Sequence, residues 1–135
     1  MEKILVEKEI KVFCVTAKSY PEGIMDAHAA LNSLVPFSAE RRYFGISRPE
    51  KLHIIYKAAA EETYNGESKK LGCESFVIKS GQYISIFIKD YLKDIQSIGK
   101  AFEKLIVRPD IDPDGYCVEW YINEKDVRCM VRLIR

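Results

Sequence analysis

The sequence has few of the features that mark specialised classes of protein. Its 135 residues include only four cysteines and two histidines. None of these residues has the spacing of a zinc site or of a C-x-x-C redox motif. We therefore expect four reduced thiols that pack as small hydrophobic groups, with no metal and no cofactor. No apolar run is long enough to span a bilayer, so a membrane partner is not expected either.

A charge excess of one sign is also absent. Lysine and arginine number 21 and aspartate and glutamate 20, which leaves a net charge of +1. This balance gives no overall field that would attract nucleic acid, and no helix-turn-helix pattern is visible, so no direct nucleic-acid contact is expected. The segment Met1 to Glu7 alternates charges and lacks the apolar centre of a signal peptide, which predicts a cytoplasmic protein.

The composition is that of an ordinary globular domain, with 47% hydrophobic and 30% charged residues. A chain of this length can bury enough surface to fold without a metal or a disulfide. We expect one domain over residues 1–135. Hydrophobic periodicity and turn residues predict its elements in this order: a strand at 8–18, a helix at 22–35, strands at 41–47 and 52–62, a strand at 75–89, a helix at 90–107 and strands at 116–122 and 126–134.

The order strand, helix, strand, strand therefore occurs twice. Tyr43 to Ser47 falls opposite Tyr116 to Trp120, and Pro49 to Lys51 falls opposite Asn123 to Lys125. This match predicts that 52–62 is a strand, although its alanine run favours helix. The expected fold class is α+β, built from two β-α-β-β repeats at about 8–63 and 75–135. Asp90 is the expected N-cap of the second helix.

Glu119 is the most unusual residue of the second repeat, because it interrupts an apolar strand. Side chains alternate along a strand, so Cys117, Glu119 and Tyr121 should share one face, and Trp120 the other. A buried ionised carboxylate is costly unless it is paired. The residues leave two interpretations open: Glu119 is a pocket carboxylate, or it pairs with a nearby arginine such as Arg41, Arg128 or Arg132.

Several aromatic residues are candidates for the walls of such a pocket. Tyr121 could orient Glu119 or contact a cationic aromatic ligand, and a core tyrosine is the alternative. Trp120 is expected mainly in the core. Tyr83 and Phe87 share one face of their strand, and each of these residues could either line a cleft or pack. The strand at 41–47 contributes two further candidates of the same kind, Tyr43 and Phe44.

Three segments of the second repeat carry a resemblance to a known family. They are Ser80 to Tyr83 followed by the apolar strand to Ile88, the helix with Phe102 near its end, and Val118 to Asn123 with its glutamate in an apolar strand. In the first repeat, Tyr43 to Ile46 resembles the aromatic-Gly-Ile strand of the same family. The chain thus resembles the GyrI-like, or AraC effector-binding, family of stand-alone DNA gyrase inhibitory proteins and effector-binding domains of multidrug-sensing regulators.

The resemblance implies a twisted antiparallel sheet with two main helices, pseudo-twofold symmetry and a central ligand cleft. It also implies ligands that are often flat, apolar and cationic. The chain is shorter than many members of the family, chiefly in the loops of its first repeat. It shows no attached DNA-binding segment, so the transcriptional role of larger relatives is not carried over.

Three functions follow as hypotheses. The first is sensing or sequestration of a small apolar, cationic or aromatic molecule, with ligand-binding residues Glu119, Tyr121, Cys117, Tyr83, Phe87, Tyr43, Phe44 and Trp120. The second is hydrolysis of strained, cyclopropane-bearing electrophiles, with Glu119 as general base and Tyr121 orienting the substrate. The third is a protein-interaction role without a small ligand, by analogy with the family's name. Whether the protein is an enzyme stays open.

Overall fold

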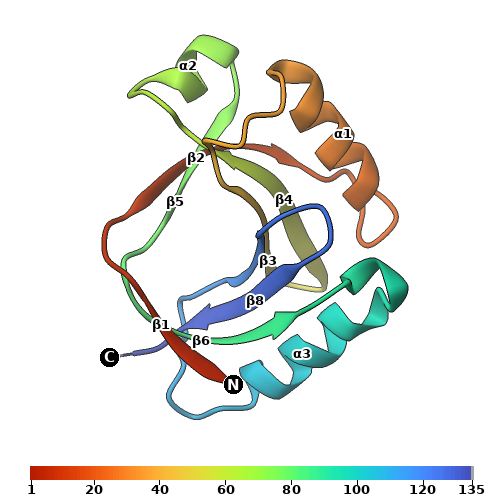
Figure 1. The fold of residues 1–135 in the computed structure, drawn as a ribbon, viewed down its shortest axis with the longest axis vertical. Helices are drawn as coiled ribbons and strands as arrows, with labels where there is room; N and C mark the ends of the chain where they lie inside the picture. The colour runs from red at the N-terminus through yellow and green to blue at the C-terminus, as the bar shows by residue number, and fades with distance from the viewer. Residues whose placement is uncertain (135) are drawn as a thin grey trace. The chain divides into compact units, whose positions relative to one another are not determined.

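The computed structural model describes residues 1–134, which divide into two compact units. Unit 1 combines Met1–Glu9 with the chain from Lys79 onward, and unit 2 is Ile10–Ile78. Each unit holds four antiparallel strands and at least one helix (Figure 1). The α+β class predicted from the sequence is therefore confirmed.

Unit 2 has the strand order β3-β4-β2-β5. One face of this sheet is covered by α1, which packs against β2 and β4 (Figure 1). Small alanines on β4 let the helix approach closely, and the core cluster is Phe13, Ala27, Leu31, Ala58 and Ala60. The elements are β2 (Ile10–Thr16), α1 (Ile24–Leu34), β3 (Tyr43–Glu50), β4 (His53–Glu61), α2 (Glu67–Leu71) and β5 (Glu74–Ile78).

Unit 1 has the strand order β1-β6-β8-β7, and α3 packs against β6 and β8 (Figure 1). Its elements are β1 (Glu2–Val6), β6 (Gly81–Ile88), the 3-10 helix η1 (Tyr91–Lys93), α3 (Gln96–Ile106), β7 (Cys117–Tyr121) and β8 (Val127–Arg132). The core under α3 consists of Ile84, Ala101, Leu105, Val127, Cys129, Val131 and Leu133.

The predicted order strand, helix, strand, strand is present in each unit, as β2-α1-β3-β4 and as β6-α3-β7-β8. Each unit adds a fourth strand from the segment that precedes the other unit's repeat. β1 precedes β2 in the chain but pairs with β6, and β5 precedes β6 but pairs with β2. The single-domain assignment and the repeat boundaries at 8–63 and 75–135 stay predictions.

The strand assignment at 52–62 is confirmed, since β4 spans His53–Glu61. Its alanines at 58, 59 and 60 are all fully buried. The helix preference of alanine is worth a few tenths of a kcal/mol per residue, and burial against α1 outweighs it.

Several local predictions were wrong. The strand predicted at 41–47 is longer than expected, because β3 continues to Glu50 and the turn lies at Lys51 and Leu52. Two elements were missed, the strand β1 and the short helix α2. The helix predicted from Asp90 begins instead at Gln96, after η1. Asp90 has a left-handed backbone with φ 53° and makes no capping side-chain bond.

Some apolar side chains of the segment predicted as a helix at 90–107 lie on the exposed surface of unit 1. Leu92, Ile95 and Ile106 are all more than half exposed. Across residues 1–134, no helix is long and apolar enough to cross a membrane.

Candidate functional site

Glu119 lies at the middle of β7 and is only 9% exposed. Cys129 of β8 is its cross-strand partner, and Cys129 is part of the core under α3. Cys117 and Tyr121 pack against the same core. The predicted grouping of Cys117, Glu119 and Tyr121 on one face is therefore confirmed, and this face is the one that α3 covers.

Two phenol rings stand beside the carboxylate. The hydroxyl of Tyr121 donates a hydrogen bond to Oε1 of Glu119. The ring of Tyr91, from η1, lies 5.8 Å from the ring of Tyr121, with 54° between their planes. The charge of Glu119 also acts on Tyr91, since burial and, secondly, this carboxylate raise the pKa of the Tyr91 hydroxyl.

The charge of Glu119 acts on both neighbouring thiols as well. Burial and, after it, the carboxylate raise the pKa of Cys117 to about 11. Burial, Glu119 and Cys117 together raise the pKa of Cys129 to about 12. Both thiols are therefore protonated at neutral pH, which disfavours thiolate chemistry at this position. Within residues 1–134, no group of three His, Cys, Asp or Glu side chains is placed to hold a metal ion.

The arginines proposed as structural partners of Glu119 pair with other carboxylates. Arg128 stands opposite Trp120 in the ladder, so its side chain leaves the opposite face of the sheet from Glu119. It forms an ion pair with Glu2 at 2.7 Å. Arg132, on the same face as Arg128, pairs with Asp112 at 3.1 Å.

In unit 2, Arg41 makes a double hydrogen bond to the carboxylate of Glu67, with both distances 3.1 Å. Each of these three arginines thus forms an ion pair with a carboxylate other than Glu119.

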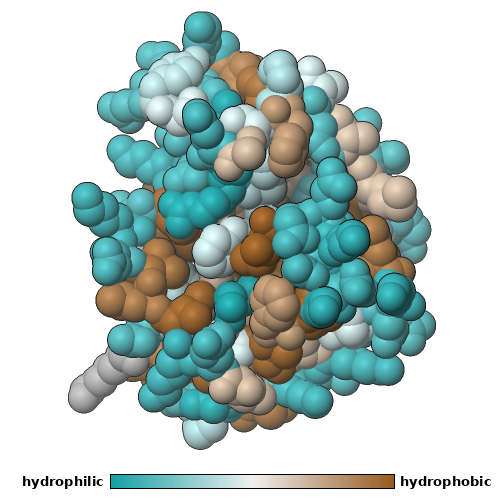
Figure 2. Space-filling model, in the orientation of Figure 1, coloured by the Kyte–Doolittle hydropathy of each residue, from teal (hydrophilic) through white to brown (hydrophobic). Residues whose placement is uncertain are grey.

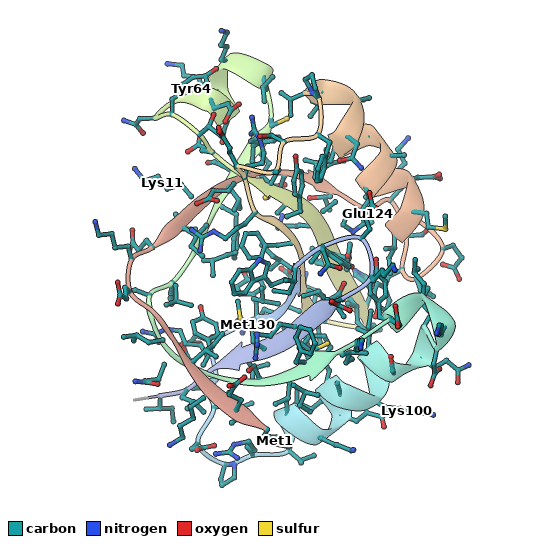
Figure 3. All side chains as sticks on the ribbon, in the orientation of Figure 1. Met1, Lys11, Tyr64, Lys100, Glu124 and Met130 are labelled. Carbon is teal, nitrogen blue, oxygen red and sulfur yellow. The ribbon has the colours of Figure 1, made fainter. Side chains whose placement is uncertain are left out.

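Three of the predicted ligand-binding residues lie on the face opposite Glu119. Tyr83, Phe87 and Trp120 share this face with Met130, which Figure 3 labels on β8. Tyr83 is buried and donates its hydroxyl to the carbonyl of Lys79 at 2.6 Å. Phe87 is 46% exposed, and the guanidinium of Arg128 lies over its ring, with the guanidinium carbon 5.4 Å from the ring centroid.

The two candidates from the first repeat pack within unit 2. Tyr43 joins the cluster under α1, stacks on Phe37 at 5.2 Å and accepts a hydrogen bond from the backbone N–H of Ser38 at 3.0 Å. Phe44 points to the other face of the sheet and is fully buried. The structure therefore brings Cys117 and Tyr121 to Glu119 within unit 1, together with two residues that the sequence did not single out.

Those two residues are Cys129 and Tyr91. The position of Cys129 could have been found, because a hairpin centred on Glu124 sets Glu119 opposite Cys129. Tyr91 offered no comparable signal, since it belongs to a 3-10 turn inside what looked like a continuous helix.

Unit 2 has a polar pair of its own under α1. Nε2 of His28 lies 2.7 Å from the hydroxyl of Tyr56, and the ring of Tyr20 is 6.2 Å from that of Tyr56. Burial lowers the pKa of His28 to about 4, so the imidazole is neutral at physiological pH. Unit 2 also has an open groove of about 490 Å³ between α2, β2 and β5, with Lys11, labelled in Figure 3, on its rim.

No family model matches this chain, and no curated protein matches it. Solved structures with similar folds include an integron cassette protein from the mobile metagenome of Vibrio cholerae, with 12% identity and a TM-score of 0.66. SAV2435, solved bound to tetraphenylphosphonium, has 13% identity and a TM-score of 0.62. Both matches cover 98% of this chain and 94% of the other.

A hydrolase from Listeria innocua has 6% identity and a TM-score of 0.56 over 98% of this chain and 90% of the other. Identities this low show the fold alone. The fold is one that holds a small molecule in at least one solved structure.

Proposed function

We propose that this protein binds a small apolar cation, with Glu119 as the counter-charge and the rings of Tyr121 and Tyr91 beside it. In this proposal the chain is a member of the GyrI-like group, and its role is sensing or sequestration. The observation that carries the proposal is a buried carboxylate next to two aromatic rings, one of which donates its hydroxyl to the carboxylate.

The physical reason is the cost of burying charge. An ionised carboxylate loses its hydration on burial, and hydrogen bonds recover only part of that free energy. Tyr121 supplies one such bond. A delocalised cation adds Coulomb attraction to Glu119 and can rest against the electron-rich faces of aromatic rings. A strongly hydrated ion would gain less, because it must give up more of its own hydration. The tetraphenylphosphonium bound to SAV2435 is a cation of the delocalised kind.

The test compares tetraphenylphosphonium with tetraphenylborate, which has nearly the same shape and the opposite charge, and with neutral triphenylphosphine oxide. We expect the phosphonium alone to raise the melting temperature and to give a dissociation constant by titration calorimetry. Glu119→Gln should weaken phosphonium binding by at least tenfold, equivalent to about 1.4 kcal/mol.

Glu124→Gln is the matched control, because Glu124 is exposed in the loop between β7 and β8 and its loss changes the net charge equally (Figure 3). Its affinity for the phosphonium should equal that of the unmodified protein. Unchanged affinity in Glu119→Gln, or equal binding of the borate, would show that the carboxylate is not the recognition group.

Hydrolysis of a strained electrophile is a second candidate. Tyr121 holds Glu119 in a defined orientation, as a general base requires, and one structure of similar fold is a hydrolase. Glu119 would accept a proton from water while the water oxygen bonds to a carbon of the strained ring. The ring bond to that carbon breaks, its electron pair leaves on the other ring atom, and that atom takes up a proton, which regenerates the carboxylate of Glu119. Recovery of intact compound after prolonged incubation supports binding. Formation of many equivalents of product by the unmodified protein, and of none by Glu119→Ala, would support hydrolysis instead.

A further inference from the structure

The outer edge of β1 has the properties of a pairing surface. β1 is the terminal strand of the sheet of unit 1, with β6 as its neighbour in the strand order. Leu5 is 57% exposed and Met1 64%. Hydrophobic surface gathers at the lower left of Figure 2, where β1 runs in Figure 1. An edge strand presents unpaired N–H and C=O groups, and these favour addition of another strand.

Symmetry restricts how two copies of such an edge can pair. Two identical antiparallel edge strands are related by a two-fold axis perpendicular to the sheet, which keeps each face continuous. Paired positions must then belong to the same face, so they must lie an even number of residues apart in the sequence. Only a few registers of β1 satisfy this condition.

The register centred on Leu5 places every charge opposite its complement. Lys3 of one copy faces Glu7 of the other, Glu2 faces Lys8, and Ile4 faces Val6 around a central Leu5 pair. Each of these contacts occurs twice by symmetry. Opposite charges directly across an antiparallel pair stabilise it, and like charges destabilise it.

The registers centred on Lys3 and Ile4 lack this complementarity. Centring on Lys3 sets that lysine against itself. Centring on Ile4 sets Lys3 against Leu5 and Glu2 against Val6, so both charges face apolar side chains. Centring on Val6 sets Lys3 against Glu9, well beyond the end of β1, and leaves Lys8 facing Ile4 and Glu7 facing Leu5. The register centred on Leu5 is thus the one that pairs opposite charges with the least extension of β1.

The edge of unit 2 does not offer the same match. β5 is the terminal strand there, and its nearest opposite charges are Glu74 and Lys79. These two lie an odd number of residues apart, so the two-fold axis excludes their pairing. Glu74 is also already bound to Lys57 and accepts a hydrogen bond from Thr16.

We propose that two copies of this chain associate through their β1 strands, antiparallel and centred on Leu5. β1 ends at Val6, so the Lys3–Glu7 contact extends the strand by one residue, and the Glu2–Lys8 contact extends it by two, to the bend at Lys8. Pairing of one short strand buries less than the roughly 1,600 Å² of a standard interface, so we expect a dimer with a dissociation constant in the micromolar range. This inference is independent of the proposed ligand.

Charge reversal gives a test that does not rely on the loss of pairing in a single variant. Lys3 and Glu7 are the positions to change, because Glu2 is already paired with Arg128 of its own chain. Two copies of Lys3→Glu would face each other with two acidic pairs, and two copies of Glu7→Lys with two basic pairs. Each variant should therefore be a monomer of about the 15.6 kDa chain mass.

Mixing the two variants should restore pairing. In an equimolar mixture, the two acidic positions of one chain face the two basic positions of the other, so a heterodimer should form. The double variant Lys3→Glu/Glu7→Lys should dimerise like the unmodified protein, because it exchanges the two charges and keeps them complementary.

Sedimentation equilibrium from the micromolar to the millimolar range reads out these states. Circular dichroism checks that each variant is folded, which we expect because Lys3 and Glu7 are exposed. Leu5→Asp, which places two carboxylates at the centre, should also be monomeric. A monomeric unmodified protein at all concentrations overturns the proposal. So does a dimer that persists unchanged in Lys3→Glu and Leu5→Asp.

Discussion

The two units share one order of elements but bury different polar groups. By the sequence separation that relates Ala27 to Ala101 and Leu31 to Leu105, the buried residues of α1 and α3, Glu119 corresponds to Gly45. By the strand alignment that sets Tyr43 to Ser47 opposite Tyr116 to Trp120, Glu119 corresponds to Ile46. Unit 2 therefore has no carboxylate at the position of Glu119 in either alignment, and its fold forms without one there.

Unit 2 places its polar pair elsewhere. By the same separation, His28 of α1 corresponds to Phe102 of α3. The imidazole of His28 meets the hydroxyl of Tyr56, a residue on β4. Unit 1 thus carries its polar group on a strand, as a carboxylate, while unit 2 carries a neutral one on a helix. The contrast agrees with a specialised role for unit 1.

Unit 2 also contains a buried carboxylate, and its environment differs from that of Glu119. The side chains of Arg41 and Glu67 are 8% and 5% exposed and are joined by two hydrogen bonds. Burial alone would raise the pKa of Glu67, but bonds from Arg41 and Thr63 outweigh it and lower the pKa. This carboxylate ties α2 to the segment before β3, which is a structural task.

The largest expected effect separates these two carboxylates. Glu67→Gln leaves the guanidinium of Arg41 buried without its counter-charge and should cost about 3 to 5 kcal/mol of unfolding free energy. If Glu119 is the counter-charge of a ligand, as proposed, Glu119→Gln keeps a hydrogen-bonding amide and should change the stability of the ligand-free protein by less than about 1 kcal/mol. Urea denaturation of both variants gives the comparison. If Glu119→Gln were the more damaging change, Glu119 would be the structural carboxylate.

The second-largest expected effect is a loss of stability at acid pH, and it comes from His28 in unit 2. The pKa of His28 is about 4 in the folded chain against 6.5 ordinarily, so the unfolded state binds more protons between these values. Stability should therefore fall as the pH drops from 6.5 to 4, by up to about 3 kcal/mol, and this contribution should be constant above that window.

His28→Gln keeps a partner for Tyr56 and removes the titration. Its unfolding free energy, measured against pH, should lose this part of the slope, while His53→Gln, at an exposed position, should keep it. Identical slopes for the unmodified protein and His28→Gln would mean that His28 is not desolvated.

The sequence predicted most of the fold because its signals were periodic. Apolar patterning located β7 and β8, and the repeated element order located β4 against the helix preference of its alanines. β1 was missed because Glu2 and Lys3 resemble a solvated terminus. Their side chains are exposed while the backbone pairs with β6, and backbone pairing leaves no side-chain signal.

The site was predictable only in part for a related reason. Alternation on one strand placed Cys117 and Tyr121 beside Glu119. It could not say whether Tyr83 and Phe87, on another strand, share that face, because this depends on the register between strands. The ladders place both on the opposite face.

A smaller effect compares one tyrosine from each unit. The Tyr121 hydroxyl donates to a carboxylate and that of Tyr56 meets a neutral imidazole. Hydrogen bonds to charged groups are worth about 1.5 to 3 kcal/mol and neutral ones about 1 kcal/mol. Tyr121→Phe should therefore destabilise more than Tyr56→Phe in thermal unfolding.

A double-mutant cycle sharpens this prediction. In a Glu119→Gln background, Tyr121→Phe should cost only about as much as Tyr56→Phe, because the acceptor is then neutral. Equal costs in both backgrounds would show that the charge on Glu119 does not strengthen the bond.

The smallest expected effect on stability comes from backbone strain at one non-glycine residue with a left-handed backbone in each unit. Lys51, in the turn between β3 and β4, has φ 56°, and Asp90, before η1, has φ 53°. A residue with a Cβ pays about 1 to 2 kcal/mol there, and glycine avoids that strain but loses about 0.5 to 1 kcal/mol of backbone entropy. Lys51→Gly should therefore stabilise the folded protein by about 0.5 kcal/mol.

Asp90→Gly should bring no gain in stability, because aspartate tolerates this conformation better than lysine and the Asp90 carboxylate lies 3.9 Å from Lys93. Chemical denaturation of both variants decides, and equal gains would mean that side-chain type has no influence at these positions.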